Sequence, residues 1–228
     1  MNTREIKIYK DLMGANDKWA GETRNLLQKY RMLMLNLIGS PGAGKTSMLE
    51  KLVECLDKRL EFAVLEGDIE TTRDAERLDS LHVRVCQLLS GGACHLEAKL
   101  VHTALQDFPL PDLDLVFVEN VGNMVCPAEF DIGEKEKIAI LSVTEGEDKP
   151  LKYPLLFREA SAVVLTKIDL LPYLPYKIDL CRENIHKIKA DLPVFELSSI
   201  TGEGFPGWVD WLIGQANREK SSSYRNNF

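Results

Sequence analysis

Apolar positions along the chain alternate between short continuous runs and longer stretches in which they recur at helical spacing. The continuous runs, rich in Val, Ile and Leu, predict buried strands at 32–38, 62–65, 83–89, 115–118, 137–143, 162–165 and 194–197. Helical spacing is clearest over 46–60 and around Phe205, Trp208 and Leu212. Strands that alternate with helices are typical of an α/β fold, and the length suits one such domain.

The two ends of the chain differ from this central part. Residues 1–30 show an amphipathic pattern that predicts an N-terminal helical extension of one or two helices, residues 31–217 form the predicted domain, and 218–228 are expected to be a flexible tail. No apolar run approaches the length of about eighteen residues that a membrane span needs, and the N-terminus lacks the apolar stretch of a signal peptide. We therefore expect a cytoplasmic protein without a membrane partner. The net charge of −7, with no cluster of Lys and Arg, argues against a nucleic-acid partner.

The segment 39–46, GSPGAGKT, fits the phosphate-binding loop pattern and lies between a predicted strand and a predicted helix. Its glycines allow backbone N–H groups to turn toward a polyphosphate, Lys45 would reach the β and γ phosphates, and the Thr46 hydroxyl would bind Mg²⁺. The alternative is an ordinary glycine-rich turn between a strand and a helix. The predicted phosphate-binding residues are Gly39, Ser40, Pro41, Gly42, Ala43, Gly44, Lys45, Thr46 and Ser47.

Acidic residues follow two other predicted strands, where ligands collect in open α/β sheets. Asp68 and Asp74 come after the second strand, and either is a candidate for holding Mg²⁺; alternatively, Thr72 or Asp74 only caps the next helix. Glu119 ends the strand 115–118 and precedes Gly122, an arrangement that predicts a nucleotide-sensing loop in which the Gly122 N–H meets the γ-phosphate. The predicted magnesium residues are Thr46, Asp68, Asp74 and Glu119, and the predicted catalytic residues are Lys45, Asp74 and Glu119.

The segment Thr166-Lys167-Ile168-Asp169 follows the strand 162–165 and favours guanine as the base. A carboxylate at Asp169 accepts hydrogen bonds from N1–H and the exocyclic amine of guanine, whereas adenine lacks that pair of donors. The stem of Lys167 would pack on the purine plane. Backbone N–H groups near Ser199, after the last strand, are placed to meet guanine O6.

Cysteine usage points to a transition-metal site. The five cysteines are an odd number at scattered spacing, so a disulfide framework is not expected. Adjacent Cys94 and His95 offer a thiolate and an imidazole, which suit Zn²⁺ or Ni²⁺, and Cys126 lies four residues past Gly122. The alternative is that these thiols are inert. Small buried hydrophobes are the expectation for Cys55 and Cys86.

Together, the phosphate-binding loop, the Glu119-Asn120-Val121-Gly122 sensor followed by Cys126-Pro127, the Cys94-His95 pair, the segment 144–150 (TEGEDKP) and the 166–169 motif resemble the HypB family of hydrogenase-maturation GTPases. The resemblance covers about 31–215. It implies a P-loop NTPase three-layer sandwich with a mostly parallel sheet and helices on both faces.

The resemblance also implies GTP-dependent homodimerisation and an interfacial site for Ni²⁺ or Zn²⁺ formed by Cys94, His95 and Cys126. Lys149 would contact the nucleotide across the dimer. The implied partners are a hydrogenase-maturation chaperone and the hydrogenase large-subunit precursor. Two departures stand out: residues 1–30 contain no Cys or His for extra nickel, and Thr166 occupies a position where Asn is usual, which predicts a weaker structural hydrogen bond.

The main hypothesis is therefore a slow regulatory GTPase that uses GTP and Mg²⁺ and delivers nickel to a hydrogenase precursor. A small-metabolite kinase would need an arginine-bearing lid, and no Arg-rich loop occurs between Gly91 and Lys152. The third hypothesis is a metal-binding module with a vestigial nucleotide site.

Overall fold

Seven parallel strands form one sheet in the order β3-β2-β4-β1-β5-β6-β7. The computed structural model describes residues 3–68 and 73–221, with side chains described from residue 14 onward. The strands are β1 (Leu33–Gly39), β2 (Phe62–Asp68), β3 (Arg84–Leu89), β4 (Leu115–Glu119), β5 (Glu136–Ser142), β6 (Ala160–Thr166) and β7 (Val194–Leu197). All seven overlap the predicted apolar runs, and the inner strands β2, β4, β1, β5 and β6 are buried because helices cover both faces of the sheet, whereas the edge strands β3 and β7 are partly exposed.

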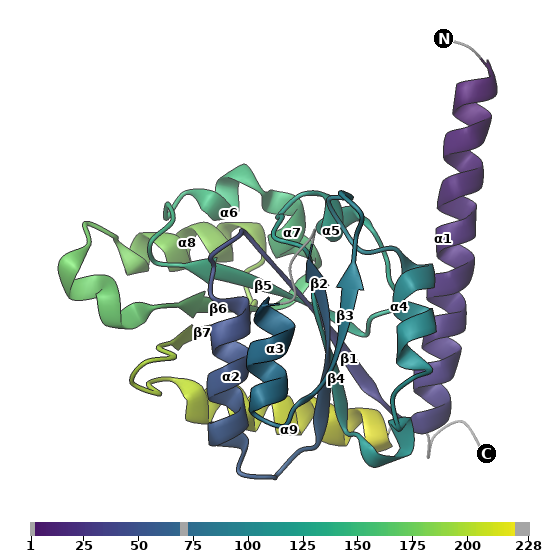
Figure 1. Cartoon of the computed structure of the whole chain (residues 1–228). Helices are drawn as coiled ribbons and strands as arrows, with labels where there is room; N and C mark the ends of the chain where they lie inside the picture. Colours follow the sequence, from purple (N-terminus) through teal and green to yellow (C-terminus); the bar gives the residue numbers. More distant parts are fainter. Residues whose placement is uncertain (1–2, 69–72, 222–228) are drawn as a thin grey trace.

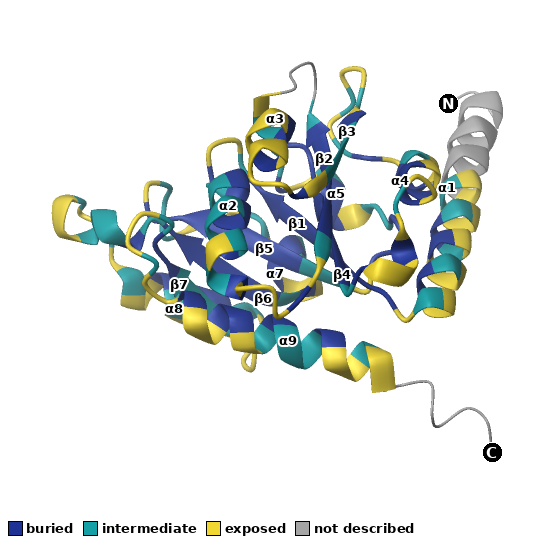
Figure 2. Ribbon diagram, turned by 60° about the horizontal axis from the view of Figure 1, so that its bottom comes forward, coloured by how far each residue is buried: buried dark blue, intermediate teal, exposed yellow. Residues whose placement is uncertain are grey.

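The helices lie in two layers (Figure 1). They are α1 (Thr3–Tyr30), α2 (Lys45–Leu56), α3 (Arg73–Ser80), α4 (Ala98–Leu105), α5 (Cys126–Glu129), α6 (Lys149–Lys152), α7 (Pro154–Glu159), α8 (Ile178–Ile188) and α9 (Phe205–Ser221), with 3₁₀ turns at Leu110–Asp112 and Ile168–Tyr173. Apolar residues of α2, α3 and α9 pack on one face of the sheet, and those of α1, α4, α7 and α8 pack on the other. The predicted three-layer α/β sandwich is confirmed, and Figure 2 shows the buried sheet between helices with exposed outer faces.

Two predicted boundaries shift for local reasons. The helix after the phosphate-binding loop ends at Leu56, not Leu60, because Asp57 and Lys58 adopt left-handed backbone conformations with φ of 45° and 61°. At the other end of the chain, α9 continues to Ser221, so residues 218–221 of the predicted tail are helical. Residues 222–228 lie outside the described part of the chain.

The N-terminal extension is one helix whose described side chains attach it to the body. Asn16 of α1 accepts a hydrogen bond from the Ala98 backbone N–H at 3.0 Å, at the first residue of α4, and donates one to the Asp131 carbonyl at 2.8 Å. Thr23 lies 3.3 Å from Nδ1 of the buried His102, as measured from its Oγ1. Within the described residues, no helix has the length and apolar character needed to cross a membrane.

Candidate functional site

The phosphate-binding loop lies at the carboxyl end of the central strand β1 and leads directly into α2. Gly44 precedes the helix with φ of 89°, a left-handed conformation that glycine adopts without strain. Lys45 and Thr46 are both buried, and Lys45 Nζ lies 3.4 Å from the carbonyl oxygens of Gly39 and Ser40. The N-terminus of α2 and the backbone N–H groups of this loop suit a bound phosphate group. The cavity beside the loop has a volume of about 390 Å³.

A group of carboxylates lines the other side of this cavity. Carboxylate oxygens of Glu66, Asp74 and Glu119 all lie within 4.8 Å of one another, and the Thr46 hydroxyl donates to Glu119 Oε1 at 2.8 Å. Burial, together with the neighbouring Glu119 charge, raises the pKa of Glu66 to about 8. Burial also raises the pKa of Glu119 to about 7, although the nearby Lys45 ammonium opposes this shift.

The two predicted acids after β2 take different positions. Asp68 lines the cavity but is not a member of the close carboxylate group, where Glu66 stands instead. Asp74 belongs to the group and also pairs with Arg77 at 2.7 Å, and Arg77 in turn pairs with Glu50 at 2.6 Å. Thr72, the alternative candidate for a helix cap, lies outside the described residues.

The chemistry of this group fits Mg²⁺. The ion prefers hard oxygen ligands and is usually bound through one or two carboxylates together with phosphate oxygens. Thr46, Asp74 and Glu119 supply a hydroxyl and two carboxylates at the phosphate-binding loop. Oε2 of Glu119 is buried and has no hydrogen-bond partner among the described residues, so it is available to a cation.

The predicted sensor loop after β4 touches the phosphate-binding loop. A Cβ added to Gly122 would lie 2.7 Å from Pro41 Cγ and 2.9 Å from Pro41 N, so only glycine fits at this close approach. Lys149, at the start of α6, lies 3.4 Å from Ser40 Oγ in the same chain, as measured from its Nζ, and pairs with Glu145 at 3.2 Å. Lys149 is therefore near the phosphate-binding loop of its own subunit, while a contact across a dimer stays a prediction.

The predicted base-binding segment also contacts this loop. Thr166 Oγ1 donates to the Ala43 carbonyl at 2.6 Å, and Lys167 Nζ donates to the Gly42 carbonyl at 2.7 Å. The hydroxyl of Thr166 makes a short, buried bond to the loop, while the expectation that this bond is weaker than that of the usual Asn stays a prediction. Asp169 accepts a hydrogen bond from Ser198 Oγ at 2.6 Å, and this bond orients the carboxylate. Ser199, the residue predicted for guanine O6, is the next residue in the same loop and is half-buried.

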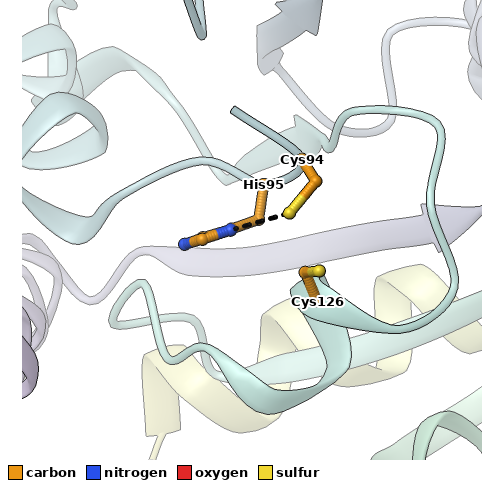
Figure 3. A group of neighbouring side chains, drawn as sticks. All are labelled: Cys94, His95 and Cys126. Carbon is orange, nitrogen blue, oxygen red and sulfur yellow. Dashed lines mark hydrogen bonds between the residues drawn. The ribbon is translucent and has the colours of Figure 1, made fainter. Parts of the chain in front are cut away.

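The segments that follow β3 and β4 bring together Cys94, His95 and Cys126 (Figure 3). One potential ligand atom of each residue lies within 4.8 Å of the others. Cys94 Sγ lies 3.6 Å from His95 Nδ1. The His95 ring stacks on Phe130 with centroids 3.7 Å apart, which fixes the plane of the imidazole. The contact with Cys126 and partial burial raise the pKa of the Cys94 thiol, whereas burial lowers the pKa of His95. Two sulfurs and one imidazole suit Ni²⁺ or Zn²⁺.

Comparison with known proteins shows the family of the chain. A family model described as "CobW/HypB/UreG, nucleotide-binding domain" matches residues 33–196. Over 215 residues the chain is 45% identical to the hydrogenase maturation factor HypB of Azotobacter vinelandii, and the match covers 93% of this chain and 70% of that protein. The chain belongs to the HypB family.

Solved HypB structures resemble the whole described fold. The crystal structure of HypB from Helicobacter pylori in complex with nickel matches with a TM-score of 0.85 at 36% identity, covering 94% of this chain and 100% of that chain. HypB from Archaeoglobus fulgidus matches with a TM-score of 0.83 at 31% identity, covering 90% of this chain and 100% of that chain. The resemblance to the HypB family that the motifs predicted is confirmed.

The HypB motifs alone did not indicate what links the sensor loop to the metal ligands. Asn123, one residue after Gly122, donates from Nδ2 to the Cys94 carbonyl at 3.1 Å. Asn120 is buried and accepts from the backbone N–H groups of Leu96 and Val121 at 3.3 and 3.0 Å. Two asparagine side chains thus bind the segment that carries Cys94 and His95 to the loop that follows Glu119.

Glu66, Ser198 and Phe130 were also missed. Glu66 directly follows the apolar run 62–65 and is part of the strand β2, and the acids Asp68 and Asp74 after it were chosen instead. Ser198 is next to the predicted Ser199, so the serine pair was a usable signal, but it did not say which hydroxyl contacts Asp169. Nothing in the sequence pairs Phe130 with His95.

Proposed function

We propose that this protein is a GTP-hydrolysing nickel metallochaperone that assists nickel insertion into a [NiFe]-hydrogenase precursor. The observation that carries the proposal is the Asn123 hydrogen bond to the Cys94 carbonyl, which joins the loop expected to sense the γ-phosphate to the segment that holds two metal ligands. Because Gly122 and Asn123 are adjacent, movement of one displaces the other. Nucleotide state and metal affinity are therefore coupled in this proposal.

The choice of GTP rests on the position of Asp169. Ser198 holds its carboxylate beside the segment in which Lys167 contacts the phosphate-binding loop. A fixed carboxylate recognises the two adjacent donors of guanine and offers nothing equivalent to adenine.

Hydrolysis uses groups that are already close together. Lys45 offsets negative charge on the β and γ phosphates, the Gly122 N–H donates to the γ-phosphate, and Glu119, held by Thr46, orients the attacking water together with Asp74. Mg²⁺ supplies further charge neutralisation at the phosphates when it is bound by Thr46, Asp74 and Glu119.

The metal cargo is proposed to be nickel, with zinc as the competing ion. The solved HypB from Helicobacter pylori contains nickel, and the ligand set of two thiols and one imidazole suits either ion. Three ligands from one chain do not complete a four-coordinate site. We propose that GTP-dependent dimerisation brings a second copy to this face, and that a maturation chaperone and the hydrogenase large-subunit precursor are the exchange partners.

Competition titration with a chromogenic chelator tests the coupling. Nickel affinity is measured with GDP and with a non-hydrolysable GTP analogue, and we expect the two affinities to differ by about fivefold or more. The Cys126→Ser variant should lose the metal, while Cys55→Ser, a half-buried cysteine on α2, is the matched control and should retain it. Equal nickel affinity in both nucleotide states would remove the switch, and metal retention by Cys126→Ser would place the site elsewhere.

A further inference from the structure

Glu66 is brought to the phosphate cavity by the order of the strands. β2 pairs with β4 in parallel, and Glu66 stands directly opposite Glu119 in that register. Neighbouring residues in register on parallel strands project to the same face of a sheet. The two glutamates therefore lie side by side, and Asp74 of α3 completes a group with carboxylate oxygens within 4.8 Å.

The Glu66 side chain is buried without a matching positive charge. The residue is 3% exposed, and its Oε2 makes no hydrogen bond among the described residues. The neutral side chain of Gln87, in the paired position of β3, lowers the pKa of Glu66 by less than burial raises it. No ion pair joins Glu66 to a lysine or arginine in the described part of the chain; the nearby Arg77 is bound to Asp74 and Glu50. Two adjacent buried carboxyl groups are therefore both ionised only with a cation between or beside them.

We propose that Glu66 is an additional carboxylate of the magnesium site, which faces the ion through its bound water and makes nucleotide binding depend on Mg²⁺. This inference rests on the proposed nucleotide-dependent function. Mg²⁺ gives up its water reluctantly and keeps several water ligands in proteins, and those waters donate hydrogen bonds to carboxylates around the ion. Glu66 lines the cavity beside the phosphate-binding loop, and its carboxylate, with an unpartnered Oε2, is such an acceptor.

Two measurements distinguish this role from a structural one. With Mg²⁺ present, the Glu66 charge stabilises the complex because it attracts the ion. Without Mg²⁺, burial and the neighbouring Glu119 raise the pKa of Glu66, so the group is largely protonated and resembles a neutral glutamine. Removal of the charge should therefore weaken the response to Mg²⁺ and leave binding of nucleotide in its absence unchanged.

The test uses fluorescent GDP titrated into the full chain, in EDTA and over a range of Mg²⁺ concentrations. Glu66→Gln keeps the shape of the side chain and removes its charge; we expect the Mg²⁺ concentration for half-maximal effect to rise about tenfold, and binding in EDTA to stay unchanged. Asp79→Asn removes a charge from the exposed end of α3 and is the control, expected to match the unmodified chain. Glu66→Asp, which keeps the charge, is expected to keep most of the Mg²⁺ response. Thermal melting verifies that each variant is folded.

The outcomes separate the inference about Glu66 from the proposed function. If Glu66→Gln weakens GDP equally with and without Mg²⁺, or changes neither measurement, Glu66 has no role toward the ion and the inference is overturned. If Glu66→Gln does not fold, Glu66→Asp decides instead: a Mg²⁺ response close to that of the unmodified chain agrees with the inference, and a response lost while Asp79→Asn retains it overturns the inference. If the unmodified chain binds no guanine nucleotide at all, the proposed function fails instead.

Discussion

Replacing Thr166 with valine tests how this chain holds its phosphate-binding loop. Thr166 is 2% exposed, and its hydroxyl donates to the carbonyl of Ala43, which is 1% exposed. Valine keeps the β-branched shape, so the main change is loss of the donor. One intramolecular hydrogen bond contributes about 1 kcal/mol, and a buried carbonyl that loses its partner costs about 1–3 kcal/mol. We expect the free energy of unfolding to fall by about 1–3 kcal/mol.

The assay is thermal and denaturant unfolding of the nucleotide-free protein. For a chain of this size, that loss corresponds to a Tm about 2–12 °C lower. Thr166→Ser, which keeps the hydroxyl, should retain most of the stability. The free energy of nucleotide binding should change less than the free energy of unfolding, because the bond already exists before nucleotide binds.

Two results would refute this reasoning. The first is a Thr166→Val variant within about 0.5 kcal/mol of the unmodified protein, which would mean that the hydroxyl holds nothing. The second is a Thr166→Asn variant that binds GDP more than about tenfold tighter, since the threonine would then be a poor substitute for the usual residue.

Three further predictions concern specificity, the sensor and the metal. Asp169→Asn should lower GDP affinity at least about a hundredfold and favour xanthosine diphosphate, whose C2 carbonyl accepts from an amide; equal loss of both nucleotides would contradict this base-recognition role. Gly122→Ala should weaken a GTP analogue about tenfold more than GDP, because the added methyl displaces the loop from Pro41; titrations that show equal losses would place Gly122 away from the γ-phosphate. Nickel affinity should rise as the pH increases from 6.5 to 8.5. The raised pKa of Cys94 keeps its thiol protonated, so nickel must displace that proton, whereas the lowered pKa of His95 leaves the imidazole neutral. A pH-independent affinity in buffered competition titrations would argue against thiolate ligation.

The sequence predicted those features whose physical basis is local. The inner strands are largely continuous apolar runs because they are covered on both faces, and the phosphate-binding loop is defined by adjacent residues. The carboxylate group at the cavity is different. It depends on β2 lying next to β4 and not next to β1, which precedes it in the chain. Glu66 was therefore missed, although Glu119, its neighbour across the two strands, was predicted.

The metal ligands show the same limit. The pairing of Cys94 and His95 with Cys126 followed from residue types and the family resemblance, and the structure brings all three together. The connecting bonds from Asn120 and Asn123 were not predicted, because they join loops after β3 and β4, two strands that do not pair with each other. Thr166 illustrates a different limit: the motif did not show that a hydroxyl at this position reaches the Ala43 carbonyl.

The side chain of Asn16 bears on where this protein can be cut. It satisfies the first N–H of α4, three residues after His95, and the carbonyl of Asp131, five residues after Cys126. A truncated protein that starts at the first strand would keep every nucleotide motif, yet it would leave both groups without these bonds and expose the α4 surface around His102. The minimal stable unit is therefore larger than the minimal motif set, and shortened forms are unsuitable for measuring metal exchange.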